Sequence, residues 1–159
     1  MKRTELYPEG VQHVAHKMRE KDRREIFATQ WSDDPWAFAN AVLRVGDFGY
    51  VIHTDDGEPV VCGGAVPMWD GVWSVWMFAT DRFDEVALST HRFAKKVFFP
   101  ALDMAGWHRL ECRSLASHTI AHKWLESLGA YKESEVTNYG KHGERFFVYC
   151  WTKPITNTQ

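Results

Sequence analysis

The chain alternates between two hydrophobic periodicities, and the first third shows the helical one. Apolar positions recur at helical spacing in three short stretches, at residues 11–18, 22–28 and 35–44. Asp34-Pro35 is a typical helix start, because an acid can cap the helix and proline suits its first turn. Asp22 is expected to cap the second helix in the same way. A short strand over residues 2–7 is expected to precede the three helices.

The middle of the chain shows the two-residue alternation of strands. Residues 48–54 and 59–66 flank Asp55-Asp56-Gly57, which predicts a hairpin because Asp-Gly readily adopts positive φ. A second turn at Asp70-Gly71 leads into residues 72–79, which are largely apolar on both faces. That pattern favours a central strand covered on both sides, within a three-stranded antiparallel meander.

A long helix is expected next, capped by Asp84 or Thr80 and running to about Phe99, and Pro100 should kink or end it. Four apolar residues mark its inner stripe: Val86, Phe93, Val97 and Ala101.

The stretch His108–Tyr131 predicts a short strand, a helix capped near Ser117, and a stop at Gly129. One face of this helix is expected to be buried, with the residues Ile120, Ala121, Trp124, Leu125 and Leu128. Residues 133–137 and 145–151 then form a closing hairpin.

Composition indicates one packed domain over residues 1–152 with a flexible tail at 153–159. Apolar residues make up 45% of the chain and aromatic residues 14%, and the net charge of −2 is spread evenly. A mixed charge pattern argues against nucleic-acid or membrane-surface binding. The N-terminus lacks the apolar core of a secretory signal, so a cytoplasmic location is expected.

The sequence gives little support for a metal site or a reactive cysteine. Cys62, Cys112 and Cys150 lie in separate strand-like runs, which is typical of reduced cysteines that pack as small apolar residues. His118 and His122 have the i, i+4 spacing of a metal-binding pair, but no acid lies between them. We therefore expect no metal site.

The element order resembles that of the GNAT acetyltransferase superfamily. The helix at 118–130 is similar to the family motif N-x-x-A-x-x-[LF]-Y-x-x-x-G-F, with Ala121, Trp124 and Gly129 at matching positions. His118 replaces the asparagine of the motif, and Leu125 stands where many members carry a tyrosine general acid. The resemblance implies an α+β or α/β fold with a mixed, mostly antiparallel central sheet of six or seven strands and about four or five helices.

A narrower resemblance spans residues 1–152. It links the chain to the GNAT-like internal virion or assembly proteins of T7-type tailed bacteriophages. The resemblance implies a virion-assembly or interaction protein in the host cytoplasm or the virion, with a virion or host protein as partner. It rests on four short segments: Met18–Ile26, Asp34-Pro35, Val75–Asp81 and Ala121–Gly129.

Acetyl-CoA is the cofactor that the GNAT resemblance implies. In that family the central strand splays from its neighbour to bind the pantetheine arm, and a glycine-rich turn wraps the pyrophosphate. The corresponding residues here would be Met77, Phe78, Ala79, Thr80, Arg82 and His118. However, no glycine occurs between Gly71 and Gly106, and Asp81, Asp84 and Glu85 would repel phosphate.

Two functions therefore follow from the sequence. One is an interaction protein with a degenerate acetyl-CoA site. The other is an acyl-CoA-dependent N-acetyltransferase that modifies a protein or a small-molecule amine. Acetyl transfer would need a base and an acid. Glu25 and His53 are the candidate bases, Tyr131 and Tyr139 are the candidate acids, and His118 is the polar residue expected closest to the cofactor.

Tryptophans near turns and helix starts would mark a partner surface if they were exposed, and would otherwise fill the core. The residues concerned are Trp31, Trp36, Trp69 and Trp73.

Overall fold

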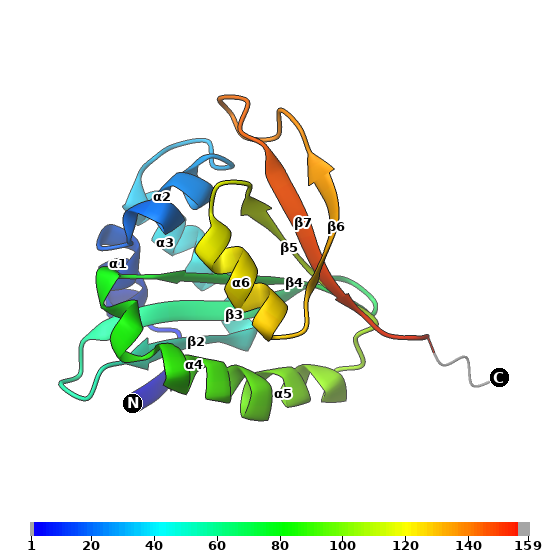
Figure 1. Cartoon of the computed structure of the whole chain (residues 1–159). Coiled ribbons are helices and arrows are strands. Elements are labelled where there is room, and N and C mark those ends of the chain that lie inside the picture. The colour runs from blue at the N-terminus through cyan, green and yellow to red at the C-terminus, as the bar shows by residue number, and fades with distance from the viewer. Residues whose placement is uncertain (1, 156–159) are drawn as a thin grey trace.

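The computed structural model describes residues 2–155, and these residues form one seven-stranded sheet in the order β1-β2-β3-β4-β5-β7-β6 (Figure 1). Only the β4–β5 pair is parallel. The mixed, mostly antiparallel sheet predicted from the sequence is confirmed. The strands are β1 Lys2–Glu5, β2 Gly49–His53, β3 Pro59–Trp69, β4 Val72–Ala79, β5 Arg109–Leu115, β6 Tyr131–Val136 and β7 Phe146–Thr152.

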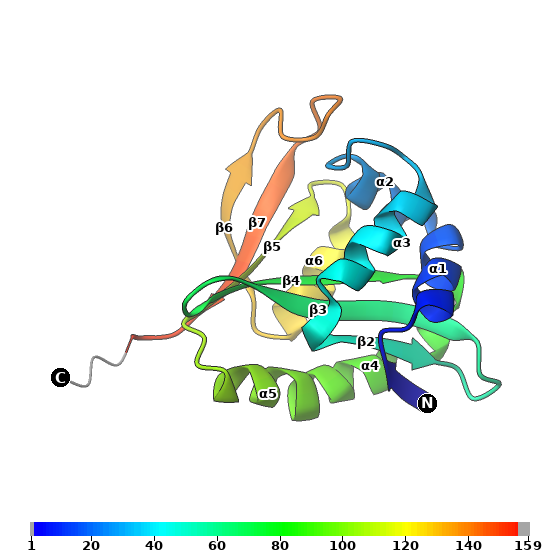
Figure 2. The same ribbon diagram turned by 180° about the vertical axis from the view of Figure 1, so that it is seen from behind.

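Helices cover both faces of the sheet. Helices α1, α2 and α3 lie on one face, and α4, α5 and α6 lie on the other (Figures 1 and 2). The α-helices are α1 Pro8–His16, α2 Glu20–Phe27, α3 Pro35–Arg44, α4 Ala87–Phe93, α5 Phe99–Met104 and α6 Thr119–Ser127. Three shorter helical segments are η1 Gly46–Phe48, η2 Asp81–Glu85 and η3 Ala94–Phe98.

Each face of the sheet has its own hydrophobic core. On the α1–α3 face, Val11, Val14 and Phe78 are among the buried residues. On the α4–α6 face, Ile52, Leu102 and Leu110 are buried. Apolar residues on both sides of the central strands explain their near-continuous hydrophobic runs.

The helix starts follow the sequence signals only in part. Helix α4 begins at Ala87 with Val86 at the capping position, and Thr80 caps η2, so the prediction that Asp84 or Thr80 caps the long helix is wrong. The Asp34 side chain accepts a hydrogen bond from the backbone N–H of Trp36 and caps α3, as predicted. Helix α2 begins at Glu20 with Arg19 at the capping position, so the prediction that Asp22 caps this helix is wrong. Asp22 is instead buried, with 5% of its surface exposed.

The long helix does not end at Pro100. Segments α4, η3 and α5 follow one another without a break from Ala87 to Met104, and η3 is a π-helical turn. A π turn advances the helix by one extra residue. The buried stripe therefore passes from Phe93 to Phe98 and Leu102, and Val97 is 44% exposed, in contrast to its predicted burial.

Strands β4 and β5 pair only over their first three residues. Val72–Ser74 are in register with Arg109–Glu111, whereas β4 continues to Ala79 and β5 to Leu115. Beyond Ser74, β4 remains paired with β3, and β5 remains paired with β7. The two strands diverge as a V (Figure 1).

Candidate functional site

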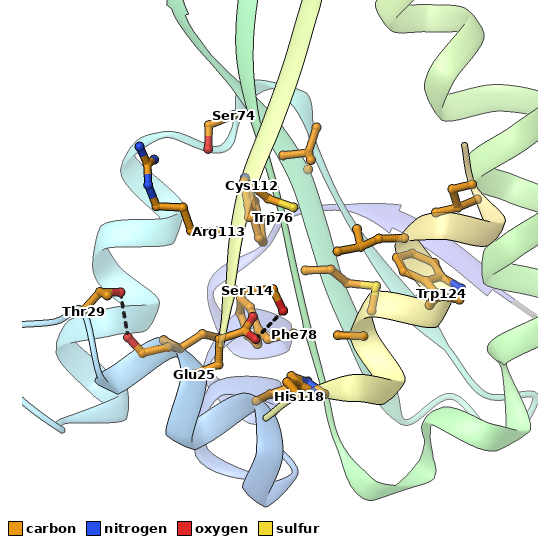
Figure 3. Close-up of a pocket in the computed structure, with 18 of the residues that line it drawn as sticks. Glu25, Thr29, Ser74, Trp76, Phe78, Cys112, Arg113, Ser114, His118 and Trp124 are labelled. Carbon is orange, nitrogen blue, oxygen red and sulfur yellow. Dashed lines mark hydrogen bonds and ion pairs between the residues drawn. The ribbon is translucent and has the colours of Figure 1, made fainter. Parts of the chain in front are cut away.

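A cleft of about 460 Å³ fills the space between the diverging strands. Its walls come from both strands and from the helices on both faces of the sheet, and most of them are apolar. Figure 3 shows that Trp76, Phe78 and Cys112 project from the strands toward this space. A concave, mainly apolar space with a few polar groups is the usual form of a ligand site.

Helix α6 forms one wall of the cleft. Its apolar face was predicted to be buried. Leu125 and Leu128 pack against the core, whereas Ile120 is exposed, and the whole face lines the cleft: Ile120, Ala121, Trp124, Leu125 and Leu128. The helix ends as predicted at Gly129, which has a φ of 97°.

Asp22 joins α2 to the open end of β4. Its Oδ2 accepts hydrogen bonds from the Ala79 backbone N–H at 2.9 Å and from Arg19 Nε at 2.8 Å. Its Oδ1 lies 2.8 Å from His118 Nε2. The Ala79 carbonyl accepts a hydrogen bond from the Arg19 backbone N–H at 2.8 Å. Both backbone polar groups of Ala79 therefore have partners from the α1–α2 segment.

Glu25, one helical turn after Asp22, joins α2 to the end of β5. Its Oε2 accepts hydrogen bonds from Ser114 Oγ and from the Leu115 backbone N–H, both at 2.9 Å (Figure 3). Burial raises the pKa of Glu25 above its ordinary value, and the nearby His118 together with the two hydrogen bonds offsets part of that effect.

His118 lies at the start of α6 and is 97% buried, since only 3% of its surface is exposed. It lines the cleft close to Glu25 and Ser114 (Figure 3). Because Nε2 lies against the Asp22 carboxylate, that nitrogen carries a proton. The other ring nitrogen, Nδ1, is buried and has no hydrogen-bond partner.

The turn after β4 is closed by an aromatic side chain. Phe83 in η2 is buried, and its ring packs edge-on against Trp124 with 6.4 Å between ring centroids. On its other side the Arg19 guanidinium lies 4.8 Å from the ring centroid. Phe83 thus connects the turn, α6 and the α1–α2 segment.

Arg82 points away from the cleft toward the β2–β3 hairpin. It forms ion pairs with Asp56, Glu58 and Glu85, and these partners raise the pKa of its guanidinium. Three carboxylates around one arginine leave this region with an excess of negative charge. The turn therefore has an electrostatic character opposite to that of a phosphate-binding loop.

The structure brings together only some of the predicted site residues. Glu25, Met77, Phe78 and His118 line the cleft, and Tyr139 lies at its edge. Thr80 is buried beside the end of β4, where its side chain caps η2.

His53 and Tyr131 lie elsewhere. His53 is buried on β2, where its Nε2 is 2.7 Å from the Tyr7 hydroxyl. Tyr131 begins β6 and is 46% exposed, and its hydroxyl contacts Thr152 Oγ1. Neither residue lines the cleft.

Asp22 and Ser114 are site residues that the sequence analysis missed. Asp22 precedes Glu25 by three residues and Ile26 by four, so all three share one face of α2. Two acids on the same face as an apolar residue are the signal that could have identified them. Ser114 carried no comparable signal within its strand.

The remaining chemistry of residues 2–155 is limited. Within that range, no group of three or more histidine, cysteine or acidic side chains could hold a metal ion. All three cysteines are free, and burial raises the pKa of the Cys112 thiol in the cleft to about 12. No helix in this part of the chain combines the length and apolar character that are needed to cross a lipid bilayer.

Known structures share this fold at low sequence identity. Ard1 from Thermoplasma volcanium has a TM-score of 0.74 and 11% identity, over 97% of this chain and 98% of that chain. The ribosomal-protein-S18-alanine N-acetyltransferase from Escherichia coli has a TM-score of 0.63 and 15% identity, over 99% and 96%. A GNAT-family acetyltransferase from Bacillus anthracis has a TM-score of 0.64 and 12% identity, over 94% and 93%.

No protein-family model matches the sequence, and no curated protein matches it either. The structural similarity shows that the fold is the GNAT fold, as the sequence resemblance implied. At these identities the similarity establishes the fold alone.

Proposed function

We propose that this protein is a GNAT-fold binding protein that acts through a protein partner and does not use acetyl-CoA. The observation that carries the proposal is the engagement of Ala79. In the family resemblance, the splayed strand offers free backbone groups to the pantetheine arm. Here the N–H and the C=O of Ala79 are already bonded to Asp22 and to the Arg19 backbone.

The turn after β4 supports the same conclusion. A phosphate-binding turn needs close approach of the phosphates to backbone N–H groups, which glycines permit. This turn has no glycine, and Phe83 contacts both Arg19 and Trp124. Arg82, the basic residue of the turn, is engaged by three carboxylates. Phosphates would meet a blocked and negatively charged surface.

Calorimetric titration with acetyl-CoA tests the proposal. We expect no heat of binding up to 1 mM cofactor, about a thousandfold above a micromolar Kd. The Escherichia coli acetyltransferase named above, titrated in the same buffer, is the positive control. Micromolar binding together with acetylation of an amine would overturn the proposal. A parallel titration uses pantetheine, which lacks the nucleotide and its phosphates. If pantetheine binds and acetyl-CoA does not, the turn after β4 is the part of the site that excludes the cofactor.

The narrower proposal concerns the partner. We infer a virion-assembly role of the tailed-phage type from the sequence resemblance, and exposed tryptophans support a protein-binding role. Trp31 is fully exposed, and Trp69 and Trp36 are 64% and 51% exposed. Tryptophan is enriched among the residues that dominate protein interfaces. Mass spectrometry of purified phage particles for peptides of this chain tests the virion assignment.

N-acetyl transfer to a protein or small-molecule amine is the second candidate function, and Glu25 is the observation that favours it. A carboxylate with a raised pKa in an apolar cleft is a suitable acceptor for the proton of an ammonium group. Bound acetyl-CoA would supply the acyl group. An acetylation rate that falls at least a hundredfold in Glu25→Gln would support this function.

A further inference from the structure

The cleft has two strand edges that face each other. The N–H and C=O of Ala79 both point away from β3, because they bond to groups of the α1–α2 segment. Backbone direction alternates along a strand, so the polar groups of Met77 and Val75 face the same way. On β5 the Arg109 N–H bonds to the Gly71 carbonyl and the Leu115 N–H bonds to Glu25. By the same alternation, the backbone N–H and C=O of Arg113 also point into the space between the strands.

At the open end of each strand edge, an acid of α2 accepts a backbone hydrogen bond that a neighbouring strand would otherwise accept. Asp22 accepts the N–H of Ala79, and Glu25 accepts the N–H of Leu115. Both are carboxylate oxygens in the position that a carbonyl oxygen of a neighbouring strand would take. The Ala79 and Leu115 N–H groups are thus already engaged, and the backbone groups left to bond an occupant are those of Val75, Met77 and Arg113, which face the same space.

The charges of the site restrict the occupant further. At the open end of the V, Asp22 is paired with Arg19, and Glu25 beside it disfavours an anion. The other lining residues, such as Phe78 and Leu125, are mainly apolar. The fitting occupant has alternating amide N–H and C=O groups and apolar side chains, and it carries no acid near α2. An extended peptide has this chemistry.

We propose that an extended segment of a partner protein binds in the cleft as an added strand between β4 and β5. The inference rests on the proposed function, because the segment takes the space that a cofactor arm would need. Backbone hydrogen bonds to both edges would supply affinity, and the apolar walls would select side chains. The unpaired part of β4, Val75–Ala79, has room for about four residues at 3.3 Å per residue.

A random library of twelve-residue peptides, displayed on phage and selected against the immobilised full chain, tests the proposal. Selected sequences should alternate apolar side chains and contain few acids, and their synthetic peptides should bind in calorimetry. Methylation of one backbone nitrogen in the central four residues should weaken binding at least tenfold, whereas methylation at the peptide terminus should not. A selection that enriches no sequence overturns the proposal.

Matched variants locate the peptide in the cleft. Cys112→Phe fills the space and should abolish binding, whereas Met104→Phe changes an exposed residue on α5 and should leave binding unchanged. Circular dichroism confirms that each variant is folded. Equal binding to Cys112→Phe and to the unmodified chain overturns the proposal.

Titration with acetyl-CoA tests the proposed function independently of the peptide site. If acetyl-CoA binds and displaces the peptide, the proposed function fails and the strand site stands. If neither acetyl-CoA nor any selected peptide binds, the proposed function stands and the inference of an added strand fails.

Discussion

Two clusters of acids flank the segment from Ala79 to Val86, and they differ in burial. In the inner cluster, the buried Asp22 and the partly buried Glu25 accept hydrogen bonds from backbone groups at the ends of β4 and β5. In the surface cluster, three carboxylates surround Arg82, with side chains between 28% and 64% exposed: Asp56, Glu58 and Glu85. A carboxylate in the inner cluster thus holds backbone groups in place, whereas a carboxylate in the surface cluster balances the charge of Arg82.

The two clusters should respond to pH in opposite directions. Burial raises the pKa of Glu25, so the folded state favours the protonated acid, and stability falls as the pH rises above the ordinary value of 4.5. Arg82 lowers the pKa of Glu58 and Glu85. Their contribution is present above the ordinary value of 4.5 and is lost as the pH falls through the lower folded values.

Asp22→Ala is expected to lower the free energy of unfolding more than the other changes below. This change leaves Arg19, His118 and the Ala79 N–H without their common partner. Removal of one member of a buried ion pair typically lowers the free energy of unfolding by about 3–5 kcal/mol. Urea denaturation measures the loss, and Asp56→Ala in the surface cluster is the matched control. A loss for Asp22→Ala no greater than that for the control would contradict the distinction between the clusters.

A smaller effect, with a defined pH dependence, is expected from Glu25→Gln. The amide keeps an acceptor for Ser114 and Leu115 but does not ionise. The stability of the variant relative to the unmodified chain should therefore rise as the pH increases from 4.5 toward neutrality. Urea midpoints at several pH values provide the measurement. A difference that stays constant with pH would show that Glu25 titrates as an ordinary exposed acid.

The smallest effect is expected from Arg82→Gln. Exposed ion pairs contribute little and are screened by salt. The urea midpoint at neutral pH should change far less than in Asp22→Ala, and the remaining difference should shrink in 0.5 M NaCl. At low pH the unmodified chain and the variant should converge, since protonation removes the carboxylate charges that Arg82 pairs with. A midpoint change that persists in high salt would indicate that Arg82 has a packing role.

Local signals in the sequence predicted the local features of the fold. Asp34 caps α3, and Gly57 and Gly129 adopt the positive φ values that their turns require. The π turn before Pro100 was not predictable, because hydrophobic spacing in sequence assumes a uniform helix. That single turn moved the buried position from Val97 to Phe98.

The candidate site was harder to predict than the fold. Asp22 bonds to Ala79, 57 residues away, and to His118, 96 residues away, so its role depends on tertiary contacts that the helical pattern does not contain. The apolar stripe of α6 was recognised, but the sequence does not distinguish a stripe that packs in a core from one that borders a cleft. Glu25 was predicted as a base for acetyl transfer and His118 from the family motif, and the structure places both at the same end of the cleft.

The three-residue parallel pairing of β4 and β5 also has a mechanical consequence. Within residues 2–155, it is the only strand pairing that joins strands β1–β4 to strands β5–β7. The relative angle of the two parts therefore depends on contacts outside the sheet ladder. The core on the α4–α6 face joins residues of both parts, and α2 adds a second link, because Asp22 bonds to the end of β4 and Glu25 bonds to the end of β5.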